Sequence, residues 1–420
     1  RKKRMSKQVV FNSGAGYWLR LIVPFTITIA AIIPAMVLLA TGNHQENPIQ
    51  GLILFGVAIV AAAFMLGWIG EAAELDLSGG LAVSILALVT ILPEYVVEFY
   101  FSWAAGADPK MIEYATANLT GANRIVQGFG WPLVALIAFF AVRKAKNLKR
   151  GQDKSFGIEL EADSRADLGY LLIASIVMLI VPLTSQMHLL VGILLIVIYC
   201  VYLWRVSGSA REEPELEGTA AHVGALPKWV RRSFIVAMLV IAAAVIFVSA
   251  HPFGDSLIEG GHALNIDEYI LVQWLAPIAS EAPEFALAFL FAAKGKEAAA
   301  LAILISSKLN QWTLLAGSMP IAYIIGGGDN AALPVAGRSA EEMWLTSAMT
   351  LLGVALLLRL RWGLAASVIT LSLFLFSVIP DETFRVYLGY VHLVVAIGYF
   401  WVYRDQVVPT LKAVANRVKK

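Results

Sequence analysis

Two short stretches, Thr90-Ile-Leu-Pro-Glu94 and Ser280-Glu-Ala-Pro-Glu284, each place a proline and a glutamate inside a long apolar run. An ionisable side chain in a membrane span costs about 2.5–3.5 kcal/mol or more, so its presence needs a reason. Proline frees backbone carbonyl oxygens one turn back, and glutamate adds an anionic oxygen. Hard cations such as Ca²⁺ and Na⁺ bind oxygens of both kinds. The matched pair therefore predicts a cation site within a membrane protein, whereas one Pro-Glu alone is equally compatible with a kinked helix.

The composition supports a membrane protein. Of the 420 residues, 59% are hydrophobic and 15% are charged, and the mean hydropathy is +0.73. Soluble domains are closer to about 45–50% apolar and about 25% charged. Basic residues stand at the ends of apolar runs, a pattern that excludes a nucleic-acid-binding face. The single cysteine, Cys200, excludes a disulfide framework or a cysteine metal site within one chain.

Spans of about 20 apolar residues predict an all-α polytopic fold of about 12 transmembrane helices. Residues 1–16 and 404–420 are expected to be cytoplasmic tails, and 207–230 a cytoplasmic linker between the halves 17–206 and 231–403. The expected spans are 17–41, 50–70, 79–104, 112–142, 168–186, 188–206, 231–250, 265–292, 297–327, 341–359, 362–379 and 383–403.

The distribution of positive charge supports this count of spans. With a cytoplasmic N-terminus, all but five of the 32 Lys and Arg residues fall on cytoplasmic segments. Lys110, Arg338 and Arg385 fall outside, and Arg124 and Lys308 fall within spans. We therefore expect both termini in the cytoplasm and the protein in the plasma (inner) membrane, surrounded by lipid. The sequence leaves its oligomeric state open.

A repeat emerges from the same map. Residues 79–142 and 265–327 each contain a Pro-Glu span, a short hydrophilic turn and a second span with an early polar cluster. The two copies run in opposite directions, because the second copy begins five spans after the first, and five is an odd number of crossings. This is the pattern of an inverted-repeat transporter, whose ion site lies at the bilayer midplane. The polar clusters are Asn118-Leu-Thr-Gly-Ala-Asn-Arg124 and Ser306-Ser-Lys-Leu-Asn-Gln311.

We interpret Glu94 and Glu284 as the carboxylates that meet the transported cation. Other candidate oxygen ligands follow from the same pattern, although each is also compatible with an ordinary helix–helix hydrogen bond: Thr90, Ser280, Asn123, and either Ser306 with Asn310 or Ser307 with Gln311.

Four carboxylates in one site would raise each other's pKa, so two of them need neutralising. Glu98 lies one turn from Glu94, and Glu281 lies three residues before Glu284. We expect Arg124 to pair with Glu98 and Lys308 to pair with Glu281. The alternative is that Arg124 and Lys308 extend to a membrane interface.

These residues resemble the cation/Ca²⁺ antiporter superfamily, which includes the sodium/calcium exchangers. Val89-Thr-Ile-Leu-Pro-Glu94 and Ala117-Asn-Leu-Thr-Gly-Ala-Asn123 are similar to the first copy of its α-repeat motifs, G-T-S-L-P-E and G-N-x-x-G-S-N. Ala279-Ser-Glu-Ala-Pro-Glu284 and Ile305-Ser-Ser-Lys-Leu-Asn310 resemble a degraded second copy. The resemblance implies a core of five plus five helices, with the first and last spans as additions.

The resemblance also implies roles for particular residues. Glu94 and Glu284 would be the central ligands, with Thr90 and Ser280 beside them. This chain departs from the motif in the first repeat, where the residues equivalent to a coordinating pair are Ala122 and Val126, and neither cluster contains an aspartate. Because this chain has fewer oxygen ligands than the family motif and two basic side chains, Arg124 and Lys308, within its spans, we expect it to bind fewer ions than the motif implies.

The leading hypothesis is therefore a secondary antiporter that exchanges Ca²⁺ for Na⁺ or H⁺ by alternating access, with no cofactor. One alternative is a monovalent-cation/H⁺ antiporter in which Lys308 or Arg124 replaces a bound ion. Another is a membrane protein that kept the scaffold without transporting. An enzyme is not expected, because no nucleophile–base arrangement and no Walker motif are found.

Overall fold

A computed structural model describes residues 14–42, 47–76, 91–146, 156–206, 216–329, 331–379 and 381–415. The chain divides into two compact units, each described here by itself. Unit 1 comprises residues 1–100, 206–271 and 419–420, and unit 2 comprises residues 101–205 and 272–418. Helices α4 (Leu92–Ala104) and α12 (Glu268–Ala293) contribute residues to both units.

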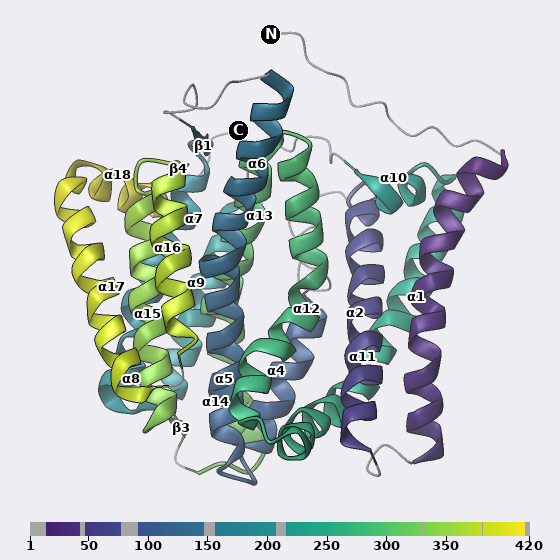
Figure 1. The fold of residues 1–420 in the computed structure, drawn as a ribbon, viewed down its shortest axis with the longest axis horizontal. Coiled ribbons are helices and arrows are strands. Elements are labelled where there is room, and N and C mark those ends of the chain that lie inside the picture. The colour runs from purple at the N-terminus through teal and green to yellow at the C-terminus, as the bar shows by residue number, and fades with distance from the viewer. Residues whose placement is uncertain are drawn as a thin grey trace. The chain divides into compact units, whose positions relative to one another are not determined.

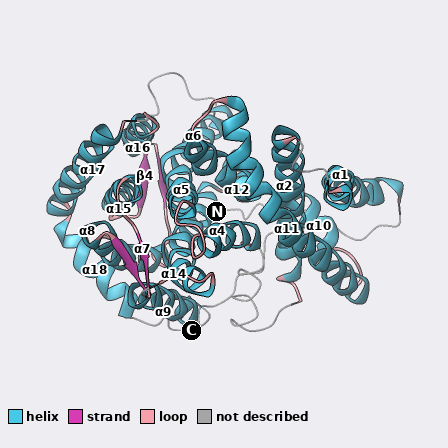
Figure 2. Ribbon diagram, turned by 90° about the horizontal axis from the view of Figure 1, so that it is seen from below, coloured by secondary structure: helices cyan, strands magenta, loops and turns pink. Residues whose placement is uncertain are grey.

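Unit 1 is built from four further helices: α1 (Ala15–Thr41), α2 (Pro48–Ala73), α10 (Gly218–Gly224) and α11 (Lys228–Leu264). Helix α2 starts in a regular way, with Pro48 in its first turn and the Asn47 side chain accepting a hydrogen bond from the Gln50 amide at 3.1 Å. Helix α11 lies along α2, and α1 also packs against α2 (Figures 1 and 2).

Helix α11 is longer than its expected span, 231–250. It continues to Leu264 with Pro252 inside it, because Phe253 and Leu257 extend its buried apolar face. Within this extension, Asp255 accepts a 2.5 Å hydrogen bond from the Tyr100 hydroxyl, which connects α11 to α4 within unit 1.

Asp76, just beyond the end of α2, fixes the start of α11. It accepts hydrogen bonds from Arg231 Nε at 2.6 Å and Nη2 at 2.9 Å, and from Arg232 Nε at 3.1 Å. The Arg231 guanidinium, helped by Arg232, holds the pKa of Asp76 below its usual value against the opposing effect of burial. The carboxylate therefore stays charged and keeps the two helix ends together.

Unit 2 contains both polar clusters, residues 118–124 and 306–311. Its first half holds α5 (Met111–Ile125), the π-helical turn η2 (Val126–Gly130), α6 (Trp131–Lys146), α7 (Ser164–Met178), α8 (Ile180–Thr184) and α9 (Leu189–Val206). Its second half holds α13 (Glu297–Asn310), the π-helical turn η3 (Gln311–Leu315), α14 (Ala316–Ile325), α15 (Arg338–Leu357), α16 (Leu364–Ser377), α17 (Glu382–Val402) and α18 (Arg404–Ala415).

Two short antiparallel ladders connect the halves of unit 2. Strand β1 (Gly157–Glu159) pairs with β4 (Arg361–Gly363), with Ile158 opposite Trp362. Strand β2 (Gln186–His188) pairs with β3 (Ala332–Pro334), with Met187 opposite Leu333. Each ladder joins one strand from the first half of the chain to one from the second (Figure 2).

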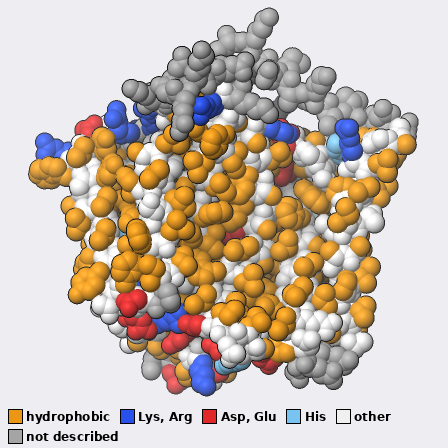
Figure 3. All heavy atoms as spheres, in the orientation of Figure 1, with side chains coloured by type: hydrophobic (Ala, Val, Ile, Leu, Met, Phe, Trp, Pro, Cys, Tyr) orange, Lys and Arg blue, Asp and Glu red, His pale blue; other side chains and the backbone are white. Residues whose placement is uncertain are grey.

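The protein is an all-α integral membrane protein. Nine helices within the described ranges are long and apolar enough to cross a membrane. The expected spans 297–327 and 362–379 correspond to the α13–η3–α14 helix and to the shorter apolar helix α16. Of the expected span 79–104, residues 79–90 lie outside the described residues and α4 covers Leu92–Ala104. Large apolar side chains lie exposed on helix flanks, among them Leu190 and Phe247. On the flank of unit 2 in Figure 3, hydrophobic side chains form a broad band, and charged side chains gather near the helix ends.

Candidate functional site

Glutamates 281 and 284 lie one turn apart on α12, which remains helical through Pro277 and Pro283. Glu281 is 2% exposed, and the Glu284 carboxyl group lies beside the Glu281 carboxyl group and the Ser307 hydroxyl. Ser280 Oγ donates to the carbonyl oxygens of Ala276 and Pro277, so its proton is used within its own helix. Unit 2 therefore holds two carboxylates on one face of α12.

The polar cluster of α13 completes this group with neutral oxygens. Gln311 Nε2 donates to Glu281 Oε1 at 2.6 Å, and Ser307 Oγ donates to Glu281 Oε2 at 3.4 Å. Gln311 Nε2 also lies 3.5 Å from Ser307 Oγ. Ser306 is exposed instead, and Asn310 is buried. Of the two registers left open by the sequence, the one with Ser307 and Gln311 faces the carboxylates; its role in binding stays a prediction.

Lys308 does not form the ion pair expected with Glu281. Its ammonium group donates instead to the main-chain oxygen of Asn123 at 3.1 Å and to Asn123 Oδ1 at 3.3 Å. Successive residues of a helix point about 100° apart, so Ser307 can face α12 while Lys308 faces α5. Lys308 is fully buried, as is Arg124, so neither extends to a membrane interface.

Arg124 takes part in a buried charge triad on three helices of unit 2. Its Nη2 lies 2.5 Å from Glu342 Oε2 on α15, and Arg385 Nε on α17 lies 3.2 Å from Glu342 Oε1. The Arg124 guanidinium also stacks 5.0 Å from the ring of Trp274 on α12. Glu342 and Arg385 were not predicted to belong to a buried group, because both fall at the edges of expected spans, where charged residues are ordinary.

The carboxylates of the first repeat lie on α4 in unit 1. Glu94 and Glu98 are 4% and 0% exposed and are four residues apart, on one helix face. Thr90 lies outside the described residues. The convergence of Glu94 with Glu284 and the pairing of Glu98 with Arg124 would join the two units, and both stay predictions.

Close packing of α5 on α12 explains one of the small residues in the first polar cluster. A Cβ atom at Gly121 would lie 1.8 Å from the carbonyl oxygen of Gln273. The nearby Gln273 side chain donates to Thr120 Oγ1 at 3.5 Å. Only glycine allows this approach, which brings the two helices that carry the polar cluster and the carboxylates together.

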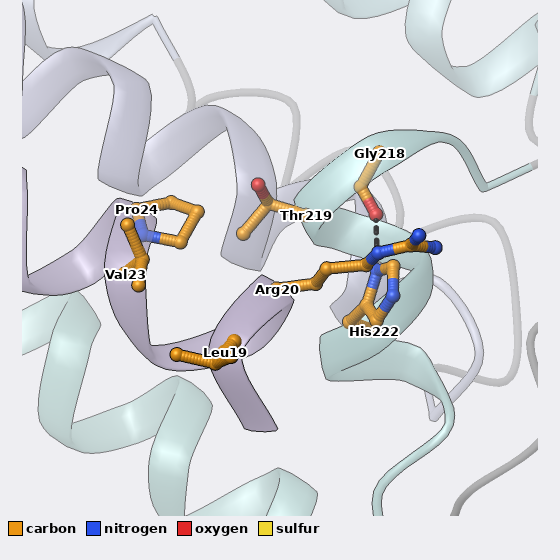
Figure 4. A pocket seen from close by; sticks show the side chains of 7 residues that line it. All are labelled: Leu19, Arg20, Val23, Pro24, Gly218, Thr219 and His222. Carbon is orange, nitrogen blue, oxygen red and sulfur yellow. Dashed lines mark hydrogen bonds between the residues drawn. The ribbon is translucent and has the colours of Figure 1, made fainter. Parts of the chain in front are cut away.

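Among the described residues, no group of three or more His, Cys, Asp or Glu side chains could hold a metal ion. Ligation of a cation in unit 2 would therefore need the hydroxyl and amide oxygens as well as the carboxylates. A separate pocket of about 540 Å³ in unit 1 is lined by α1 and α10 residues, including Arg20, Pro24 and His222 (Figure 4). It contains none of the candidate ligands.

Comparison with known proteins decides the family. The profile of the sodium/calcium exchanger protein family matches residues 47–208 and 234–380, which include both repeats. The chain belongs to this family. A solved structure described as the H⁺/Ca²⁺ exchanger CAX is 31% identical, with a TM-score of 0.86 over 96% of this chain and 98% of that one. No curated protein matches the sequence.

More distant members share the fold. The structure of native YfkE is 17% identical and gives a TM-score of 0.58 over 90% of this chain and 99% of that one. The sodium-calcium exchanger NCX_Mj, soaked with Na⁺ and Sr²⁺, is 18% identical and gives a TM-score of 0.52 over 80% of this chain and all of that one. The predicted membership of the cation/Ca²⁺ antiporter superfamily and the predicted all-α membrane fold are thus confirmed.

The two repeats of this exchanger share one more feature, which the sequence did not reveal. The π-helical turn η2 begins three residues after Asn123, and η3 begins three residues after Lys308. Such turns are frequent at functional sites. Aligning the two turns makes Ser307 and Gln311 equivalent to Ala122 and Val126. The first repeat therefore lacks the hydroxyl and amide that face Glu281 in the second.

Proposed function

We propose that this protein exchanges Ca²⁺ for H⁺ across the plasma membrane by alternating access. The observation that carries the proposal is the buried group on α12 and α13: two carboxylates, Glu281 and Glu284, with the oxygens of Ser307 and Gln311. Ca²⁺ prefers such a mixture of charged and neutral oxygens. The 31% identity to a protein described as an H⁺/Ca²⁺ exchanger supports H⁺ rather than Na⁺ as the counter-ion.

In this mechanism the carboxylates bind either Ca²⁺ or the counter-ion, never both, and this exclusion couples the two fluxes. Glu94 and Glu284 supply the central carboxylates, one from each repeat. Glu281 is added to them because it accepts the hydrogen bonds of both Gln311 and Ser307. Thr90, Ser280 and Asn123 remain further candidate ligands from the repeats.

The orientation proposed from the positive-inside pattern places both termini in the cytoplasm. The turn at Gly106, between α4 and α5, would then lie on the outer side of the membrane. The turn at Lys294, between α12 and α13, would lie on the cytoplasmic side. The energy for export would come from the ion gradient alone.

Purified protein in liposomes tests the proposal. We expect an imposed H⁺ gradient to drive Ca²⁺ uptake, and Glu94→Gln or Glu284→Gln to lower the initial rate at least tenfold while the variants fold normally. Glu113→Gln, at an exposed carboxylate on α5, is the matched control and should keep the parent rate. Full transport by the Glu94→Gln/Glu284→Gln double variant would refute the site.

A panel of Ca²⁺, Na⁺ and K⁺ in the same assay addresses the monovalent-cation/H⁺ alternative, which the buried cation of Lys308 favours. Flux of Na⁺ or K⁺ against H⁺ without Ca²⁺ flux would replace the proposal by that alternative. Absence of flux for every cation, together with no cation-dependent rise in the unfolding temperature, would instead indicate a scaffold that does not transport.

A further inference from the structure

The Lys308 side chain lies where a lysine is costly. It is fully buried; within the described ranges its ammonium group donates hydrogen bonds to the two oxygens of Asn123 and lies 5.6 Å from the centre of the Trp312 ring. In the part of the chain that the structure describes, no carboxylate is within salt-bridge distance of it. An ammonium group without an anionic partner loses its hydration on burial, so neutral oxygens must replace the lost water.

The surroundings of the ammonium group are those of a bound monovalent cation. A main-chain carbonyl and an amide oxygen are ligands that hard cations use, and an aromatic face also attracts cations. The amide of Asn123 is oriented for this purpose, because its Nδ2 donates to the Leu119 carbonyl at 3.0 Å and its Oδ1 is left to accept from Lys308.

The position within the repeat strengthens this interpretation. Aligning η2 with η3 makes Asn123 and Lys308 equivalent residues, so their contact joins like positions of the two inverted copies. The π-helical turns pack crosswise here, η2 against α13 and η3 against α5. The contact also lies next to the exchangeable site, since Ser307 precedes Lys308 in the chain.

We infer that the Asn123 oxygens form a second cation subsite that the Lys308 ammonium group fills permanently, so that this exchanger carries one ion fewer than its fold can hold. The inference deepens the proposed function and rests on it for the adjoining site. A tethered ammonium cannot be released with the transported ions. It also supplies the positive charge of that missing ion in every state of the cycle.

The test uses the full-length protein with Lys308→Ser, which removes the ammonium group and adds a hydroxyl oxygen, and Lys308→Arg, which keeps a tethered cation. The unfolding temperature is measured while N-methylglucamine is replaced by Na⁺ at constant ionic strength. We expect Na⁺ to raise the unfolding temperature of Lys308→Ser by about 2 °C or more beyond its effect on the wild type and on Lys308→Arg.

An equal effect of Na⁺ on all three proteins would overturn the inference and would identify Lys308 as a helix–helix strut. If Lys308→Ser folds poorly, its yield of monodisperse protein should rise at least twofold with Na⁺ and not with N-methylglucamine; no rise overturns the inference too. The unfolding temperature is measured without transport, so the two proposals can fail separately. A wild type that moves no Ca²⁺ would refute the proposed function, and the effect of Na⁺ on Lys308→Ser would still decide whether the second subsite exists.

Discussion

Polar side chains of α13 and the first residue of η3 point in two different directions. Ser307 and Gln311 point toward the α12 carboxylates, and Lys308, between them in sequence, points toward Asn123. One helix thereby presents neutral oxygen atoms on one face and a positive charge on another. This separation places Lys308 next to the proposed cation site without an ion pair to Glu281.

Replacement of neighbouring serines tests which face binds. Ser307→Ala removes the hydroxyl beside Glu281 and Glu284, and we expect it to raise the Ca²⁺ concentration for half-maximal flux about fivefold, as for loss of one hydrogen bond or ligand of about 1 kcal/mol. Ser306→Ala should have a smaller effect, because Ser306 is exposed. Flux measured over a range of Ca²⁺ concentrations compares them. A larger effect at Ser306 would restore the other register.

The sequence was sufficient to select these residues as candidates, but it did not predict which helix each side chain faces. The Pro-Glu pairs and the polar clusters follow from residue type and spacing, since ionisable residues in apolar runs are rare. The register of the second cluster did not follow, because Ser306-Ser307 and Asn310-Gln311 offer two equivalent i, i+4 pairs. The π-helical turn that distinguishes them is a backbone feature without a clear residue signal.

At the scale of elements, contacts between helices hold the polar clusters in place. Glu342 of α15 is shared by Arg124 of α5 and Arg385 of α17. Helix α17 corresponds to the last expected span, which the family resemblance treats as an addition to the core. This added helix therefore supplies a charge to the same buried group as a helix of the first repeat. Removing one member of such a group typically costs several kcal/mol.

The approach of α5 to α12 can be tested at one glycine. We expect Gly121→Ala to lower the unfolding temperature by several degrees, because its Cβ would overlap the Gln273 carbonyl and force the helices apart at a cost of about 2 kcal/mol or more. Gly398→Ala on α17 is the control, since a Cβ there meets nothing within 4 Å and alanine favours a helix. Thermal unfolding in detergent measures both. Equal stability of both variants would contradict the close approach.

At the scale of the whole chain, hydropathy and charge were sufficient for the class and the approximate positions of the spans. They were insufficient for the length of α11, because Pro252 and the histidines around it resemble a loop in sequence. The charge triad was also out of reach, since it joins residues more than 200 positions apart, and composition says nothing about which helices pack together.

The proposed orientation makes a prediction at this scale. In a Cys200→Ser background, a cysteine at Asp108 should react with a membrane-impermeant maleimide on intact cells, whereas a cysteine at Glu161 should react only after permeabilisation. Both positions are exposed; Asp108 precedes α5, and Glu161 follows α6 in the chain and lies between β1 and α7. Gel-shift labelling compares the two. Reaction of both residues from the same side would contradict an odd number of crossings between them.

The two strand ladders have a mechanical consequence. Strands β1 and β2 lie just before and just after the α7–α8 segment, and strands β3 and β4 lie just before and just after α15. Because β1 pairs with β4 and β2 pairs with β3, the α7–α8 segment and α15 are hydrogen-bonded to each other at both ends. Such pairing opposes sliding of one helix along the other. We therefore expect the α7–α8 segment and α15 to move as one body, and we expect the movement that the proposed alternating access requires at connections without a ladder.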